Sequence, residues 1–200
     1  MLSRINLIWL LGALLLVRIL AMVLVPFADT TEPRYAEIAR LMMTSNDWIT
    51  PWFEPGVPFW GKPPLSFWAQ ALAFKLFGVN EFAGRLPALL AFIATAWMVW
   101  RLAISVASQD VAAAAVVVYA GMLLTFVAAG TVMTDPYLAL GTTWAMVAFY
   151  LAPKEDVWYW RYGFFIGLAI GLLAKGPLAI VIAGAPIGVW VLIQGKLMYY

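Results

Sequence analysis

Long apolar runs alternate with short polar junctions along most of this 200-residue chain, and one long polar stretch near the N-terminus interrupts the pattern. A helix of about 20 apolar residues crosses the hydrocarbon core of a lipid bilayer. The alternation therefore predicts an all-α integral membrane protein, a polytopic helical bundle of about six spans. The predicted spans cover residues 5–27, 86–107, 111–130, 137–152, 158–174 and 178–193.

The polar stretch begins with an amphipathic segment, residues 29–43. Its apolar side chains recur at the i, i+3, i+4, i+7 spacing that places them on one face of a helix. Ionisable side chains occupy another face, which is typical of a helix lying at a membrane surface. The apolar face is formed by Tyr35, Ile38, Ala39 and Met42, and the charged face by Arg34, Glu37 and Arg40.

A proline-rich piece separates this amphipathic segment from a short apolar one. Residues 45–47 end the predicted helix, and the prolines that follow keep the next piece irregular. Pro63 and Pro64 then begin an apolar helix over residues 65–77. Because this helix is too short to cross a bilayer comfortably, it is expected to be a re-entrant or interfacial segment.

Composition narrows the chemistry as well as the fold. The chain is 65% hydrophobic and 11% charged, with a mean hydropathy of +0.92, which excludes an ordinary soluble domain. The net charge of +2 is too small to indicate a nucleic-acid partner. Cys and His are both absent, so thiol catalysis, imidazole bases and the commonest zinc ligands are excluded. Acid–base chemistry therefore has to use carboxylates, Lys or Tyr.

Counting the spans assigns each junction to one side of the membrane. The short loops on the side opposite the polar stretch carry more basic than acidic residues, which favours that side as cytoplasmic. The first loop, residues 28–85, is therefore expected on the extracytoplasmic face of a single transmembrane domain, residues 1–200. The first span is read as an uncleaved anchor. The residues expected to share the extracytoplasmic face are Asp29, Glu32, Lys62, Asp135 and Lys175.

Carboxylates and a lysine at one membrane face have the chemistry for a group transfer. Two carboxylates from separate loops are suited to divide general-base and orienting roles, and Asp29 or Glu32 would act with Asp135. Lys62 is suited to hold a phosphate as a point charge. Together these side chains are suited to a transfer reaction with an anionic leaving group.

Each candidate also has a structural alternative. Asp29 and Glu32 have the spacing of a capping box, and Asp135 before a proline matches a helix cap. Lys62 is also suited to anchor at lipid head groups. Arg18, inside the first span, is expected to be either functional or a residue that snorkels or pairs internally.

Several short motifs resemble the bacterial protein mannosyltransferase and aminoarabinose transferase families, which are GT-C glycosyltransferases. The most specific is the run EPRYAEIAR at residues 32–40, followed by DWITP at 47–51 and KPP at 62–64. Weaker matches in the same order are TDP at residues 134–136 and KGP at 175–177. The resemblance covers essentially the whole chain.

The resemblance implies an inverting transfer of a sugar from a polyprenyl-phosphate donor to a hydroxyl of lipid A, another glycolipid or a protein. The catalytic Asp of these families begins an Asp-Glu pair, and this chain has Thr31 and Glu32 there. Asp29 and Glu32 are therefore both candidates for the base. The other implied site residues are Asp135 as the second acid, Lys62 at the donor phosphate, and Tyr35 with Arg34 beside it.

The resemblance also sets expectations for metal, location and length. Aminoarabinose transferases have Glu before the motif lysine, where this chain has Gly61. No metal ligand and no certain cofactor is therefore assigned, and a divalent metal stays an open alternative. The chain is expected in the bacterial inner membrane as a multi-pass protein, and as the N-terminal portion of a longer enzyme. Its expected partners are the lipid-linked donor, a lipid or protein acceptor, and membrane lipids.

Two other functions remain open at this stage. A lipid-linked sugar flippase or transporter would suit the interrupted helix at residues 175–177 and the membrane-depth Arg18. It should, however, place its polar residues near mid-span, whereas here they gather in the first loop. A noncatalytic assembly subunit would need only packing surfaces and would tolerate loss of Asp29, Glu32 and Asp135 together.

Overall fold

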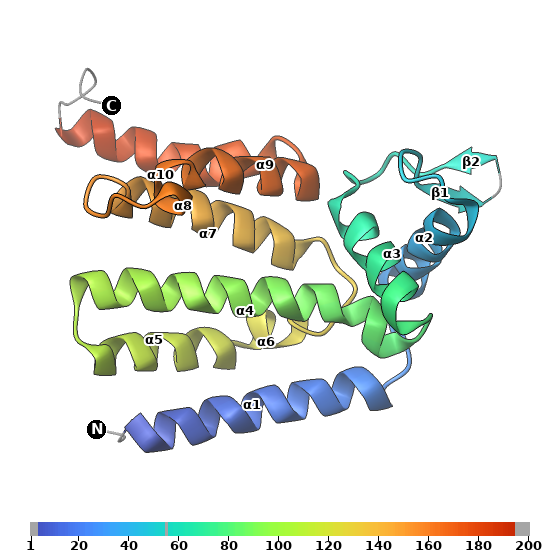
Figure 1. Cartoon of the computed structure of the whole chain (residues 1–200), viewed down its shortest axis with the longest axis horizontal. Helices are drawn as coiled ribbons and strands as arrows, with labels where there is room; N and C mark the ends of the chain where they lie inside the picture. The colour runs from blue at the N-terminus through green and yellow to red at the C-terminus, as the bar shows by residue number, and fades with distance from the viewer. Residues whose placement is uncertain (1–3, 55, 195–200) are drawn as a thin grey trace.

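The computed structural model describes residues 4–54 and 56–194, and within them the chain is mostly helical. Long helices run side by side to form a body, and two helices with a short hairpin form a lobe at one end of it (Figure 1). The body contains α1 (Arg4–Leu24), α4 (Glu81–Val106), α5 (Gln109–Gly121), α6 (Leu123–Ala128), α7 (Asp135–Leu151), α8 (Trp158–Arg161), α9 (Gly163–Lys175) and α10 (Leu178–Gln194). The lobe contains α2 (Thr31–Ser45), β1 (Trp52–Glu54), β2 (Val57–Pro58) and α3 (Leu65–Phe77).

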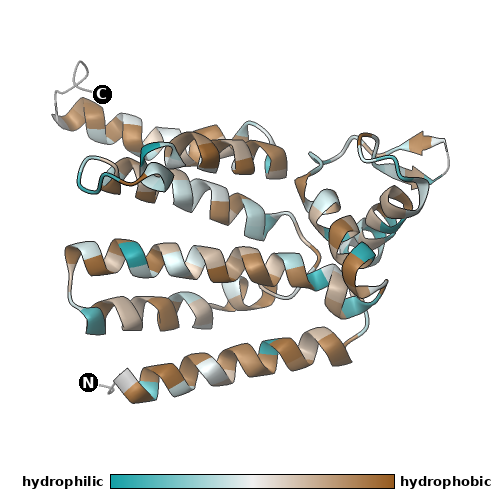
Figure 2. Cartoon of the chain, in the orientation of Figure 1, coloured by the Kyte–Doolittle hydropathy of each residue, from teal (hydrophilic) through white to brown (hydrophobic). Residues whose placement is uncertain are grey.

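Hydrophobic residues cover most of the body helices, and hydrophilic ones gather in the loop between α7 and α8 and in parts of the lobe (Figure 2). Two helices are long and apolar enough to cross a membrane by length and composition, α1 over Ile5–Leu24 and α4. The other apolar helices are shorter, between 10 and 17 residues. The helical class predicted from the sequence is thus confirmed.

The third predicted span is wrong as a single helix, because the chain breaks at Met122 between α5 and α6. Met122 has extended backbone angles, φ −63° and ψ 129°. The hydroxyl of Thr125 donates to the Met122 carbonyl at 2.8 Å and also to the Tyr119 carbonyl. A Thr side chain that bonds nearby backbone carbonyls competes with helical hydrogen bonding, so a continuous apolar pattern does not reveal the break.

Two further boundaries differ from the sequence prediction. The second span, predicted from residue 86, begins at Glu81, because the side chain of Asn80 accepts a hydrogen bond from the Ala83 N–H at 2.9 Å and caps the helix. The fifth, predicted over residues 158–174, is divided at Tyr162 into α8 and α9.

The lobe is built on the predicted amphipathic helix. Tyr35, Ile38, Ala39 and Met42 are all buried, as the spacing predicts. Their face packs against Phe67 and other side chains of α3 rather than lying open for a membrane surface. The stretch expected to be irregular instead contains a short antiparallel pair, with Trp52 opposite Pro58.

Close backbone packing joins α7 to α9. A Cβ atom added to Gly141 would lie 2.5 Å from the Gly171 nitrogen and 2.6 Å from the Gly167 carbonyl oxygen. Such contacts are open only to glycine, and small residues four apart are a common basis for close helix packing in membrane proteins. The packing fixes the C-terminus of α9 beside the N-terminus of α7.

The polar junctions gather as the span count predicts. The end of α1, the lobe, the start of α7 and the turn between α9 and α10 lie at one end of the body, which we call the lobe end (Figure 1). The turn between α4 and α5 and the loop before α8 lie at the opposite, far end.

Candidate functional site

Asp135 and Lys175 form an ion pair at the lobe end. The Lys175 ammonium donates to Asp135 Oδ1 at 2.6 Å, across 40 positions of sequence. Asp135 stands in the first turn of α7 and Lys175 in the last turn of α9, where each charge is favoured by the helix dipole. The Asp135 side chain remains 50% exposed, so the carboxylate is partnered and still accessible.

Lys175 also shares a cavity with Lys62. This cavity has a volume of about 450 Å³, and its walls include Pro63, Pro64 and Trp60. No acidic side chain lines it among the described residues. Two cations over rigid proline walls form a suitable site for an anion such as a phosphate.

Tyr35 connects the lobe to this pair. Its ring packs edge-on against Phe67 at 5.4 Å and lies 5.9 Å from the ring of Phe59. Burial raises the pKa of the Tyr35 phenol, which the nearby charges of Arg34 and Lys175 act to lower. Tyr35 therefore lies within electrostatic reach of the ion pair, and the Arg34 guanidinium lies 5.5 Å from the centre of its ring.

Glu32 is buried at the centre of a hydrogen-bond network, with only 4% of its surface exposed. Oε1 accepts from Arg85 Nε and the Val132 N–H, both at 2.9 Å. Oε2 accepts from Arg85 Nη2 at 2.7 Å and the Ala28 N–H at 3.0 Å. Burial alone would raise the pKa of Glu32, but these hydrogen bonds outweigh it and place the pKa below its ordinary value of 4.5.

Arg85 completes this network and was not among the residues singled out from the sequence. Its guanidinium donates to the carbonyls of Met22, Val25 and Pro26, at 3.2, 2.6 and 3.0 Å. The Glu32–Arg85 pair thus joins the end of α1, the start of α2, α4 and the junction that leads into Asp135. An arginine at the start of an otherwise apolar helix was the available signal in the sequence.

The Asp29 carboxylate differs from that of Glu32 in its exposure and in its hydrogen bonds. Its side chain is exposed, and its Oδ1 accepts only local hydrogen bonds, from the N–H and the hydroxyl of Thr30 at 2.6 and 3.3 Å. Its φ of +65° is an uncommon, strained conformation for a residue other than glycine. The capping-box alternative for Asp29 and Glu32 is wrong, because Glu32 bonds the Ala28 N–H and Thr30 precedes the helix without a side-chain cap.

Arg18 pairs internally, as one of its two alternatives predicts. Its Nη2 donates to the Val127 carbonyl at 2.6 Å near the end of α6, and its guanidinium lies 5.6 Å from the Phe126 ring centre. Gly130 makes room for it, since a Cβ there would lie 2.2 Å from Arg18 Nε. We assign Arg18 no part in the candidate site.

The cavity beside Lys62 offers a metal ion no carboxylate ligand among the described residues. The ring of Phe59 fills the space beside Gly61, where a Cβ would lie 2.7 Å from a ring carbon. Across residues 4–54 and 56–194, no three carboxylates converge closely enough to hold a metal ion. We therefore assign no step to a metal.

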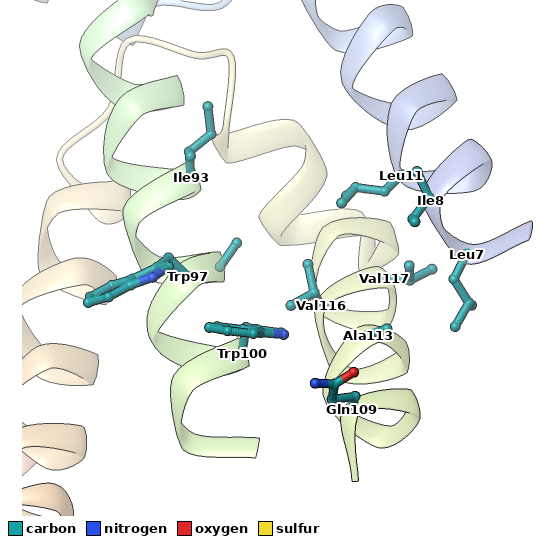
Figure 3. A pocket seen from close by; sticks show the side chains of 11 residues that line it. Leu7, Ile8, Leu11, Ile93, Trp97, Trp100, Gln109, Ala113, Val116 and Val117 are labelled. Carbon is teal, nitrogen blue, oxygen red and sulfur yellow. The ribbon is translucent and has the colours of Figure 1, made fainter. Parts of the chain in front are cut away.

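A larger cavity of about 520 Å³ lies elsewhere, between α1, α4 and α5 (Figure 3). Leu11, Trp97 and Trp100 contribute to its mostly apolar lining, and Gln109 adds an amide. Because no ionisable side chain lines it among the described residues, it lacks the chemistry that the lobe end provides.

Comparison with known proteins places this chain in a family. Residues 61–198 match the dolichyl-phosphate-mannose-protein mannosyltransferase family, and the chain belongs to it. Among curated relatives, the undecaprenyl phosphate-alpha-4-amino-4-deoxy-L-arabinose arabinosyl transferase of Edwardsiella ictaluri is 36% identical over 170 residues, 82% of this chain and 31% of that protein. The Yersinia pestis enzyme of the same name is 33% identical, over 78% of this chain and 29% of that protein.

Solved structures show the same fold. ArnT from Cupriavidus metallidurans in the apo state superposes with a TM-score of 0.83 at 22% identity, over 95% of this chain and 36% of that one. The crystal structure of ArnT bound to undecaprenyl phosphate gives a TM-score of 0.81 at 23% identity, over 98% of this chain and 37% of that one. The chain therefore spans about a third of the length of the relatives it matches, and the family predicted from the sequence is confirmed.

Proposed function

We propose that this chain forms part of a membrane glycosyltransferase that moves a sugar from a polyprenyl-phosphate donor to a hydroxyl acceptor. The observation that carries the proposal is the shared position of three side chains. Lys62 and Lys175 line one cavity, and Lys175 is bonded to the accessible carboxylate of Asp135. A donor with an anionic leaving group needs ammonium groups, and an acceptor with a transferable proton needs a carboxylate. These side chains bring the two kinds of group side by side.

The lysines are suited to the leaving group. When the bond between the anomeric carbon and the phosphate oxygen breaks, that oxygen gains negative charge. Fixed ammonium groups at Lys62 and Lys175 stabilise this charge without having to reorient, as preorganised electrostatic catalysis requires. The phosphate then departs with the bonding electron pair, and a strong general acid is unnecessary.

The carboxylates are suited to the acceptor. The acceptor hydroxyl attacks the anomeric carbon from the face opposite the phosphate, and its proton passes to a carboxylate. Both oxygens of Glu32 already accept two hydrogen bonds each, whereas Asp29 is exposed and locally strained. We therefore assign the base to Asp29, orientation of the acceptor to Asp135, and positioning of the junction before Asp135 to Glu32.

The substrates are assigned by class. The relatives named above are arabinosyl transferases that use undecaprenyl phosphate-linked aminoarabinose, and one matching ArnT structure contains undecaprenyl phosphate. These names support a polyprenyl-phosphate donor for this chain. Its acceptor is the hydroxyl of lipid A, another glycolipid or a protein.

The placement of the helices in the membrane is proposed from their length and from the charge of the loops. We place α1 and α4 across the bacterial inner membrane, the shorter apolar helices of the body beside them as further spans, and the lobe at the extracytoplasmic face. Within the lobe α3 would lie in the membrane interface, because Leu72, Leu76 and Phe77 remain exposed. Tyr35 and Arg34 then border the donor site from the lobe side.

The test removes one charge at Lys62 in the full-length protein. Lys62→Met keeps the alkyl stem and should lower turnover by roughly 10²–10³. Lys62→Arg should recover part of it, because a planar guanidinium replaces a compact ammonium imperfectly. The assay is sugar transfer from a polyprenyl-phosphate sugar in detergent, at matched protein levels. Lys75→Met, in the last turn of α3 and outside the cavity, is the control.

The outcomes separate the three functions considered. Unchanged turnover in Lys62→Met would leave Lys62 as a head-group anchor and defeat the proposed site. Movement of the lipid-linked sugar across vesicles without transfer would favour a transporter. A noncatalytic subunit would show neither activity in any variant.

A further inference from the structure

A third cavity, with a charged side chain in its lining, lies at the far end, away from the candidate site. It is a groove of about 400 Å³ between α7 and α10. Its walls are apolar and aromatic, with Phe149, Ile187 and Trp190 among them, and Lys154 lines it at the loop after α7. The groove is within the range of roughly 300–1,000 Å³ that is usual for small-molecule sites.

The ammonium of Lys154 is held at this groove by an aromatic ring. Its Nζ lies 3.4 Å from the centre of the Tyr150 ring, and Tyr150 itself lines the groove. A cation over an aromatic face is attracted to it by the ring quadrupole. The charge therefore stands at a defined point of the groove wall instead of on a freely moving side chain.

The two acidic residues that follow Lys154 in the sequence are paired with other side chains. Glu155 accepts two hydrogen bonds from Arg101, at 2.8 and 2.6 Å, and one from the Trp160 indole at 2.9 Å. Asp156 is paired with Arg161. Among the residues that the structure describes, Lys154 has no acidic partner within ion-pair distance. The lining of the groove therefore carries an uncompensated positive charge.

We propose that this groove binds one anionic glycerophospholipid, with an acyl chain between α7 and α10 and the phosphate at Lys154. A basic residue at the cytoplasmic mouth of an interhelical groove attracts anionic head groups. Trp190 and Tyr150, 41% and 37% exposed, are residues that favour the membrane interface. The proposal rests on the membrane placement proposed above, but not on the transfer reaction.

The first test measures retained lipid in the full-length protein, purified in mild detergent from bacterial membranes. Native mass spectrometry should find one phosphatidylglycerol-class lipid per wild-type molecule. Lys154→Gln should lower its retention about fivefold, which corresponds to the loss of one interfacial charge. Lys154→Arg should retain it. The control Arg161→Gln removes a charge from the same end but not from the groove, and should also retain it. Equal retention in wild type and Lys154→Gln would overturn the proposal.

The second test identifies what occupies the groove in the membrane. A photoreactive phenylalanine analogue in place of Ile187 should cross-link phospholipid on illumination of intact membranes. A cross-link to another protein segment without lipid, or no lipid adduct, would show that the groove is not a lipid site. Neither readout depends on sugar transfer, so failure of the proposed reaction would leave both results interpretable.

Discussion

Glu32 and Arg85, 53 positions apart in the sequence, form a buried ion pair in which the carboxylate also accepts two backbone N–H groups and the guanidinium binds three carbonyls. Every polar contact of the carboxylate is thus made inside the protein. The pair holds the chain on both sides of the candidate site, because it contacts the segment before Asp29 and the junction before Asp135.

Removing one member of this pair should destabilise the fold. Arg85→Met leaves the Glu32 carboxylate buried without its cation and should lower the free energy of unfolding by about 3–5 kcal/mol. The double change Glu32→Gln with Arg85→Met should cost less than the sum of the two single changes, because it leaves no unpaired charge. Thermal unfolding in detergent measures both. Strictly additive effects would show that the two side chains act independently.

Glu32 should also make stability depend on pH. Its pKa is lower in the folded protein than the ordinary value of 4.5. Its stabilising contribution is therefore complete above that value and is lost as the pH falls through the lower, folded pKa. The difference in melting temperature between wild type and Glu32→Gln should be largest at neutral pH and shrink below about pH 4.5. A difference that grows on acidification would contradict the assignment.

Asp29 should affect turnover with little effect on folding, since its side chain is exposed and its contacts are local. Asp29→Asn removes the proposed base and should lower the transfer rate by about 10²–10⁴, the usual contribution of general-base catalysis. Glu32→Gln should instead reduce stability together with activity. The two variants are compared by transfer rate and melting temperature on the same preparations. Normal turnover in Asp29→Asn would return the base assignment to Glu32.

The orientation of the lobe can be tested by labelling. Ser45, at the exposed end of α2, and Lys154, at the far end, should lie on opposite sides of the membrane. In a background without cysteine, an impermeant thiol reagent added to spheroplasts should label Ser45→Cys and spare Lys154→Cys. Disruption of the membrane should make both reactive. The reverse pattern in intact spheroplasts would invert the proposed topology.

Local features of this fold were readable from the sequence. The helix predicted over residues 65–77 is found as Leu65–Phe77, because two prolines precede it and Gly78, with φ +79°, follows it. The buried face of α2 follows directly from side-chain spacing. The grouping of the polar junctions required only a count of spans, and in the structure these junctions lie at one end of the body (Figure 1).

Contacts between distant residues were not readable in this way. The sequence places Asp135 and Lys175 on one side, but their 2.6 Å contact depends on backbone packing between α7 and α9. The burial of Glu32 depends on Arg85, for which local patterns give no partner. For the same reason two neighbouring acids, Asp29 and Glu32, were equivalent candidates until their surroundings were seen.

The glycine contacts between α7 and α9 have a consequence for how this protein tolerates sequence change. Because backbone touches backbone at Gly141, Gly167 and Gly171, the separation of the two helices does not depend on any side chain that fills the space between them. Substitutions in the loops around the cavity should alter which molecules fit there while leaving the spacing of the carboxylate and ammonium intact. Substrate preference can therefore vary without a change in the charge geometry. A substitution at Gly141 or Gly167, where a Cβ would meet the backbone of the other helix, would affect both at once.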